Sequence, residues 1–296
     1  MLKIDGVAGV GVGHNVGSNP TIIIFTETPG VRGLPTFLDG VPVIVQFSGK
    51  FFANPKPDKP GKPPKPEEPD LTPKDRWDRP VPIGVSTGHP DVTAGTIGAR
   101  VTNGTNVYAL SNNHVYANEN KASIGDAVIQ PGTYDGGISP DDNIGTLSAY
   151  VPIDFNGGIN YIDAAIASTT TALLGNSTPS DGYGTPMATI TGASIGMKVK
   201  KYGRTTGETN GRVYAVNATV DVQYDSGVAR FENQIVVTPG AFSAGGDSGS
   251  LIVVNNKRSS DHLKPVGLLF AGSSLYTIAN PIGTVLESFG VTIDGE

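Results

Sequence analysis

The sequence predicts an all-β protein, and three observations support that fold class. Glycine supplies 40 of the 296 residues, about twice its usual share near 7 %. Charged residues are sparse, at 16 % of the chain, and β-branched runs recur between turn residues. Short strands joined by tight turns have this composition, and we expect a helix only near residues 282–290.

Residues 1–53 are predicted to form a small β or α/β unit. Its strand-like runs are VAGVGVG, TIIIFTE and VPVIVQF. A unit of about fifty residues is marginally stable alone, so we expect it to pack on another surface. Two roles stay open for it: a regulatory or pro-segment that is cleaved off, or a permanent domain that docks a protein partner or a second copy of the chain.

Residues 54–79 are predicted to be a linker. The stretch NPKPDKPGKPPKPEEPDLTP holds eight prolines and four lysines, with no aliphatic residue before Leu71. Such a composition cannot contribute a packed core and favours an extended, polyproline-like spacer.

Residues 80–296 are predicted to form the main domain. Strand-like runs separated by Gly, Asn, Asp and Pro follow one another about every ten residues, a spacing typical of sandwiches and barrels. A double barrel fits this length, whereas a single sandwich of about 100 residues does not. The main runs are TIGARVT, NVYALSN, DAAIAST, RVYAVNATVDVQY, NQIVVTP, SLIVVNN and PVGLLFA.

Charge and composition exclude several classes of partner and cofactor. The net charge of -6 is spread without long acidic or basic blocks, so neither a nucleic acid nor an anionic membrane is expected as a partner. The absence of cysteine excludes disulfides, thiolate catalysis and cysteine-zinc sites. The four histidines are scattered, so no metal or other cofactor is expected. The loop DGGISPDDN, residues 135–143, could hold calcium, but a solvated loop is the preferred interpretation.

The sequence also predicts a cytoplasmic location. Asp5 and repeated glycines interrupt the amino-terminal apolar residues before a secretory segment could form. No apolar run approaches the roughly 18 to 20 residues that span a bilayer.

The stretch GGDSGS, residues 245–250, is the first candidate for chemistry. A serine hydroxyl needs a base within hydrogen-bonding reach and a third group that orients the base. The glycines allow a tight turn in which the backbone N–H groups of Gly246 and Ser248 converge, as an oxyanion hole requires. The alternative is a glycine-rich hairpin turn with no chemical role.

His114 and Asp163 are the candidates for the base and the orienting group. His114 follows an apolar run in YALSNNHVYA, and an imidazole near its usual pKa of about 6.5 can accept a proton from serine. Asp163 precedes apolar residues in NYIDAAIAS, where a partly buried carboxylate needs a hydrogen-bond donor such as imidazole. Taken singly, each also fits a structural role, as a core histidine or a strand-end aspartate.

The three candidates occur in the order His, Asp, Ser, and their motifs LSNNHVYA, NYIDAAIA and GGDSGS resemble those of the chymotrypsin-like (trypsin-like) serine peptidases. The wording LSNNHV, with TAGTIGARV, IQPGTYDGG and KYGRTTGETNGRV, resembles the cysteine-free bacterial and plant narrow-leaf-type branch. The resemblance implies two six-stranded antiparallel β-barrels with a cleft between them. It implies His114 as general base and acid, Asp163 as its orienting partner, Ser248 as nucleophile, and Gly246 with Ser248 as the oxyanion hole.

The resemblance also implies a specificity pocket. Phe242, six residues before the nucleophile, would lie at its floor, and Phe270, Ala271 and Gly272 would form its wall. Phe270 departs from the family, which often has serine there. Without a carboxylate at the floor, cleavage after Lys or Arg is not expected, and small or apolar side chains are. The alternative for Phe242 is an ordinary core residue.

Asp247, beside the nucleophile, needs a cation if it is buried. The resemblance implies Arg204, in KYGRTTG, as its ion-pair partner, so that the site forms without a newly cut amino terminus. An ordinary surface arginine is the alternative.

The sequence therefore predicts a serine endopeptidase that cleaves protein or peptide substrates through an acyl-enzyme. The main rival is a catalytically silent protein of the same fold that acts as a protein-binding or structural module.

Overall fold

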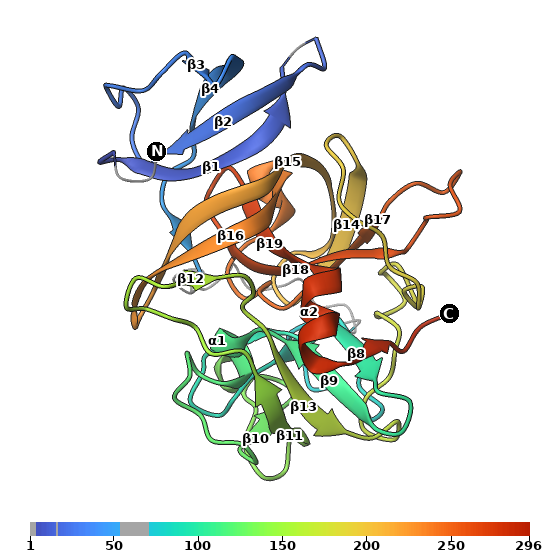
Figure 1. Cartoon of the computed structure of the whole chain (residues 1–296). Helices are drawn as coiled ribbons and strands as arrows, with labels where there is room; N and C mark the ends of the chain where they lie inside the picture. The colour runs from blue at the N-terminus through green and yellow to red at the C-terminus, as the bar shows by residue number, and fades with distance from the viewer. Residues whose placement is uncertain (1–3, 16, 54–70) are drawn as a thin grey trace, which may run out of the picture.

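The computed structural model describes residues 4–15, 17–53 and 71–296, and it shows three stacked β-rich parts (Figure 1). Most of the amino-terminal strands lie at one end, and a large barrel lies in the middle, which we call the second barrel. A six-stranded sheet lies at the other end, and we call it the first barrel because most of its strands come earlier in the sequence. Within the described residues the α-helices are α1 (Asn113–Tyr116) and α2 (Ile282–Phe289). Neither has the length and hydropathy needed to cross a membrane.

The first barrel is a six-stranded sheet in which the strand order is β10-β11-β13-β9-β8-β20. Its last member comes from the carboxyl terminus, and it pairs antiparallel with β8 through Ile293 and Val101. The chain end therefore completes a barrel formed mostly by residues far earlier in the sequence. The strands are β8 (Ala99–Thr102), β9 (Val107–Ser111), β10 (Ala127–Ile129), β11 (Asn143–Tyr150), β13 (Ala165–Thr169) and β20 (Thr292–Ile293).

The second barrel is a closed ring of strands in the order β16-β19-β18-β17-β14-β15. The ring closes because its first and last strands, β16 and β15, also pair with each other. These two strands form a hairpin much longer than the other strand pairs. Its turn reaches down toward the first barrel (Figure 1). The strands are β14 (Lys198–Gly203), β15 (Gly207–Tyr224), β16 (Gly227–Thr238), β17 (Leu251–Val254), β18 (Pro265–Gly272) and β19 (Thr277–Pro281).

The amino-terminal unit consists of strands and joins the second barrel. Its strand β1 pairs antiparallel with β15, with Gly9 opposite Val220, and β2, β4 and β3 extend this sheet outward, whereas β5 pairs with β15 and β18. A Cβ on Gly9 would lie 2.9 Å from the carbonyl oxygen of Thr219, so the glycine allows the two backbones to approach closely. Where the prediction left β or α/β open, the described residues show β only. The strands are β1 (Val7–His14), β2 (Pro20–Thr26), β3 (Phe37–Leu38), β4 (Val41–Phe47) and β5 (Phe51–Phe52).

The predicted linker lies partly outside the described residues, which resume at Leu71. Trp77 packs against the core of the first barrel, and the Nε atom of Arg76 lies 2.6 Å from Oδ1 of Asp142. Residues 71–79 therefore belong structurally to the barrel that follows them.

Buried apolar clusters hold the parts together. One cluster lies between the barrels and includes Leu110, Leu268 and Val285 of α2. Another joins the amino-terminal unit to the second barrel through Phe25, Phe51 and other buried residues. The short remaining elements are β6 (Ser86–Thr87), β7 (Gly95–Thr96), β12 (Ile159–Asn160) and the 3₁₀ turns η1 (Thr133–Asp135) and η2 (Gly240–Phe242).

Candidate active site

His114 and Asp163 meet at the ends of two neighbouring strands of the first barrel. The helix α1, which carries His114, follows β9 at once, and Asp163 comes shortly before β13; these strands pair with Ala165 opposite Ser111. The Nδ1 atom of His114 lies 2.5 Å from Oδ2 of Asp163, and the backbone N–H of His114 donates to Oδ1 at 3.2 Å. The carboxylate thus holds the residue through both ring and backbone. Their side chains are 2 % and 0 % exposed.

Asp163 also receives two side chains of the second barrel. The hydroxyl of Tyr224, at the end of β15, donates to Oδ2 at 2.8 Å. Asn280 on β19 accepts from the Asp163 backbone N–H at 3.2 Å and donates to its carbonyl oxygen at 3.1 Å. Sequence reasoning missed both residues. No local motif marks them, because other polar residues occur in the same strands and nothing in the sequence singles these two out.

Ser248 lies on a tight turn between η2 and β17. The turn contains Gly246 at φ +91° and Gly249 at φ +97°, a region that side chains other than glycine rarely adopt. The first barrel holds the turn through Thr96, whose hydroxyl donates to the carbonyl of Gly246 and whose N–H donates to the carbonyl of Ser248, both at 2.8 Å. Among the described residues, the N–H groups of Gly246 and Ser248 donate no backbone hydrogen bond.

The His114 segment and the Ser248 turn both lie close to Gly95. A Cβ at Gly95 would lie 2.5 Å from a methyl group of Val115 and 3.1 Å from the carbonyl oxygen of Ser248. Only glycine leaves room for both. The structure therefore brings the His, Asp and Ser motifs to one place between the barrels.

The hydroxyl of Ser248 is directed at carbonyl oxygens. It lies 3.3 Å from the carbonyl oxygen of Ala53 and 3.4 Å from that of Phe270. Within the described part of the chain, its hydrogen bonds do not include the His114 ring.

The strand β5 of the amino-terminal unit occupies the cleft beside Ser248. It lies between β15, with Gln223 opposite Phe52 in a parallel pair, and β18, with Gly272 opposite Phe52 in an antiparallel pair. The N–H of Ala53 donates to the carbonyl of Gln223 at 3.1 Å. Ala53 is 1 % exposed. Peptide ligands often bind to proteins in this way, by adding a strand to a sheet edge.

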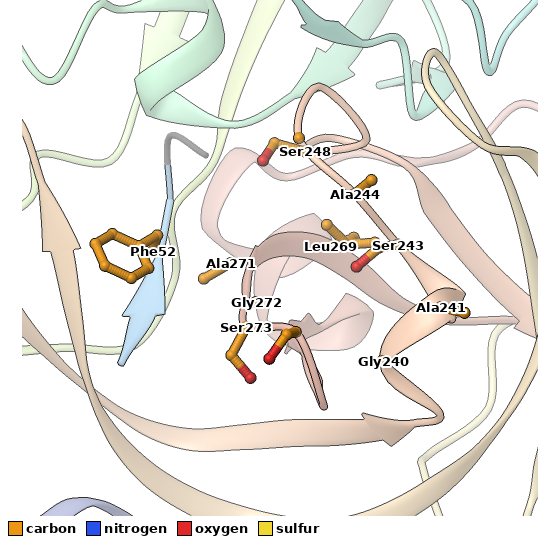
Figure 2. A pocket seen from close by; sticks show the side chains of 12 residues that line it. Phe52, Gly240, Ala241, Ser243, Ala244, Ser248, Leu269, Ala271, Gly272 and Ser273 are labelled. Carbon is orange, nitrogen blue, oxygen red and sulfur yellow. The ribbon is translucent and has the colours of Figure 1, made fainter. Parts of the chain in front are cut away.

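A pocket of about 470 Å³ opens beside Ser248. Figure 2 shows Ser248 at its upper rim and Phe52 of β5 across from Ala271. Its remaining lining residues are small or apolar: Gly240, Ala241, Ser243, Ala244, Gly245, Leu269, Gly272, Ser273 and Ser274.

Two of the four residues predicted for the specificity pocket, Ala271 and Gly272, line the pocket beside Ser248. Phe242 does not: its side chain is fully buried in the apolar core of the second barrel, because the η2 turn directs it inward between its lining neighbours Ala241 and Ser243. The Phe270 ring is also fully buried, with its centroid 4.8 Å from that of Phe231. Only its carbonyl oxygen reaches the site.

The predicted ion pair between Asp247 and Arg204 is wrong, because Lys201 is the partner of Asp247. The Nζ atom of Lys201 lies 3.3 Å from Oδ2 of Asp247, and both side chains are 0 % exposed. Burial lowers the pKa of Lys201, and the neighbouring carboxylate opposes that shift. The N–H groups of Thr205, Thr206 and Ala244 also donate to Asp247. The sequence KYGRTTG contains both Lys201 and Arg204, and the prediction considered only the arginine.

Arg204 instead joins the two barrels. Its guanidinium makes a two-point contact with Asp135 in η1, at 2.8 and 2.6 Å, and stacks over Tyr134 with 5.3 Å to the ring centroid. Asp142 is likewise paired with Arg76. Two acids of the loop considered for calcium are therefore bound to arginines, and no group of metal-ligating side chains was found among the described residues.

Comparisons with known proteins agree with this geometry. Residues 142–291 match the family model described as the Nal1 C-terminal domain. Glutamyl endopeptidase 2 from Streptomyces griseus is 30 % identical over 142 residues, which cover 48 % of this chain and 68 % of that protein. The chain belongs to the chymotrypsin-like serine protease family. The resemblance and the double-barrel fold expected from the motifs are thereby confirmed.

A solved structure shares the fold of this chain. The structure described as a glutamic acid specific serine protease that utilizes a histidine triad in substrate binding superimposes with a TM-score of 0.52 and 23 % identity, over 72 % of this chain and 100 % of that one. Thermobifida fusca protease A gives a TM-score of 0.49 with 20 % identity, over 73 % and 100 % of the two chains.

Proposed function

We propose that this member of the family is a serine endopeptidase whose triad is His114, Asp163 and Ser248. The observation that carries the proposal is the contact of 2.5 Å between His114 Nδ1 and Asp163 Oδ2, beside a glycine turn that presents Ser248 at a pocket. A carboxylate on Nδ1 fixes the tautomer in which Nε2 is free to accept a proton.

In the proposed mechanism, Ser248 Oγ attacks the carbonyl carbon of the scissile bond and His114 Nε2 takes the hydroxyl proton. The N–H groups of Gly246 and Ser248 stabilise the negative oxygen of the tetrahedral intermediate. His114 then gives the proton to the leaving amine, and the acyl group remains on Ser248. A water molecule, deprotonated by His114, hydrolyses this ester and regenerates the hydroxyl.

We also propose that residues 1–53 act as a regulatory segment that inhibits the site. Support comes from β5, which fills the cleft, and from Ala53, whose carbonyl oxygen lies 3.3 Å from the nucleophile. A substrate strand would have to displace β5 from Gly272 before reaching Ser248. Whether the segment is cleaved off or remains attached is tested by comparing the mobility of purified wild type and Ser248→Ala on denaturing gels: a shorter wild type alone indicates self-processing.

The decisive test of the peptidase proposal is labelling with a fluorophosphonate, located by mass spectrometry. Wild type is expected to be labelled at Ser248, while Ser248→Ala and His114→Ala are not. Phe52→Glu should be labelled faster than wild type, because a charge weakens the contact of β5 with an apolar pocket. Phe47→Glu on β4, also in the amino-terminal unit and 45 % exposed, is the matched control and should not change the rate.

A catalytically silent protein of this fold is the second candidate, favoured by the Ser248 hydroxyl pointing at two carbonyl oxygens. If folded Phe52→Glu also resists labelling, the silent alternative replaces the peptidase. Equal labelling rates in Phe52→Glu and Phe47→Glu would contradict the proposed inhibition by β5 but would leave the peptidase proposal standing.

For specificity, we propose an uncharged side chain in the pocket beside Ser248. Relatives are named for cleavage at glutamate, and one is described as binding substrate through histidines. Among the described residues, those that line this pocket include no histidine, lysine or arginine. A glutamate side chain would therefore lose its water without gaining a cation from them. A peptide-library cleavage profile tests this: preference for glutamate would contradict it.

A further inference from the structure

The side chain that supports the His114–Asp163 pair from the second barrel is Tyr224. Its hydroxyl donates to Oδ2 of Asp163 at 2.8 Å, the same oxygen that contacts His114 Nδ1. Its ring lies edge-on to the His114 ring, with centroids 5.9 Å apart and an interplanar angle of 72°. One residue therefore touches both members of the pair.

The Tyr224 side chain is buried and its ring is held by packing against neighbouring aromatic rings. It is 2 % exposed, and its ring also packs edge-on against Phe155 at 5.5 Å and lies 6.1 Å from Phe231. Burial, together with the negative charge of Asp163, raises the pKa of its hydroxyl well above the usual value. The group therefore stays protonated and remains a donor to the carboxylate.

The neighbourhood explains why a tyrosine is needed. Phe270 has no polar side-chain atom, and its ring is buried against Phe231. Asn112 and Asn280 bind the backbone of Asp163. Among the described residues, Tyr224 is thus the donor other than His114 that reaches the carboxylate oxygens.

The tip of the β15–β16 hairpin is itself fixed to the first barrel. The N–H groups of Asp225 and Ser226 donate to the carboxylate of Glu119 at 3.2 and 2.8 Å. Glu119 lies just after α1 in a run of three residues with positive φ, Asn118 at 47°, Glu119 at 54° and Asn120 at 71°. A strained turn next to the His114 helix thereby anchors the strand end that carries Tyr224.

We propose that Tyr224 is a positioning residue of the triad, whose hydroxyl fixes the Asp163 carboxylate in the rotamer that faces His114 Nδ1. This inference rests on the proposed peptidase function for its effect on rate. The geometric part, one donor that holds the carboxylate against the imidazole, can be tested without any activity.

The test compares Tyr224→Phe with Tyr202→Phe. Both tyrosines are buried, and each donates to a carboxylate, since Tyr202 bonds Asp181 at 2.7 Å; only the first carboxylate belongs to the triad. Loss of a hydrogen bond to a charged group should lower kcat roughly tenfold to a hundredfold in Tyr224→Phe. Its KM should stay near that of wild type, because Tyr224 does not line the pocket. Tyr202→Phe should keep both constants.

The second readout is NMR of the full chain labelled with ¹⁵N-histidine. The Nδ1 proton of His114, assigned by its loss in His114→Gln, should move in Tyr224→Phe by clearly more than in Tyr202→Phe. An unmoved signal with kcat within about twofold of wild type would overturn the proposal. Absence of peptidase activity both in wild type and in folded Phe52→Glu would instead refute the proposed function, and the NMR signal would still decide the role of Tyr224.

Discussion

Two fully buried carboxylates flank the cleft, Asp163 on the first barrel and Asp247 on the second, and they are satisfied in different ways. Asp247 is paired with the ammonium group of Lys201, within 3.3 Å, and with backbone N–H groups. Asp163 faces His114 and the uncharged hydroxyl of Tyr224. Among the described residues, no lysine or arginine pairs with it.

The difference follows from what each carboxylate has to do. Asp247 holds a turn in place, so a permanent cation and fixed donors compensate its burial at all times. In the proposed mechanism, Asp163 stabilises an imidazolium that exists only while a proton is in transit. A permanent cation beside it would oppose the charge that His114 gains, whereas a neutral donor orients the carboxylate without that cost.

The largest effect is expected for Asp163→Asn. An amide facing Nδ1 favours the tautomer with the proton on Nε2, which cannot accept the Ser248 proton, so kcat on a fluorogenic peptide should fall by about 10⁴-fold. Thermal unfolding should show a folded protein. A loss of less than about tenfold would mean that the carboxylate is only structural, as Asp247 is.

The next effect concerns Lys201→Met, which leaves Asp247 buried without its cation. Breaking a buried pair in this way should lower the free energy of unfolding by roughly 3–5 kcal/mol, measured by urea denaturation. Lys200→Met is the matched control, since its pair with Glu208 is partly exposed at 10 % and 27 % and should contribute no more than about 1 kcal/mol. Equal losses would show that the Asp247 site is not special.

Sequence reasoning predicted those candidate residues that stand in recognisable contiguous motifs. The stretches around His114, Asp163 and Ser248 each combine a polar residue with a strand end, so their positions follow from local pattern and motif. Lys201 and Tyr224 could not be chosen in this way. Lys201 competes with Arg204 within one heptapeptide, and Tyr224 depends on the length and register of the β15–β16 hairpin, whose irregular pairing between Val213 and Val220 shifts the faces of the strand.

The fold was predictable for a similar reason. Apolar runs between turn residues marked three strands of the first barrel (β8, β9 and β13), four of the second (β15, β16, β17 and β18) and three of the amino-terminal unit (β1, β2 and β4). The position of β5 was not predictable, because FFA is too short to show a period. Its place is set by contacts with β15 and β18, which lie some 170 and 220 positions later in the chain.

A smaller effect is expected for Arg204→Met, which separates the role of Arg204 from that of Lys201. The variant loses the two-point contact with Asp135 between the barrels, and the free energy of unfolding should fall by about 2 kcal/mol. Arg230→Met removes a similar contact with Asp221 that is more exposed, at 36 % and 24 %, and should cost under about 1 kcal/mol. Loss of Ser248 labelling in Arg204→Met without loss of stability would instead support the original prediction that Arg204 supports the Asp247 turn.

The smallest effect is expected for Phe242→Leu, which tests where the second barrel ends and the pocket begins. Because the ring is fully buried in the barrel core, an apolar replacement should lower the free energy of unfolding by no more than about 1.5 kcal/mol and leave the peptide-library profile unchanged. Ala271→Val, which adds two methyl groups at the pocket wall, should shift that profile toward smaller side chains. A changed profile in Phe242→Leu would mean that the Phe242 ring turns toward the pocket when β5 leaves the cleft. The shape of the cleft between Asp163 and Asp247 would then depend on whether β5 or a substrate occupies it.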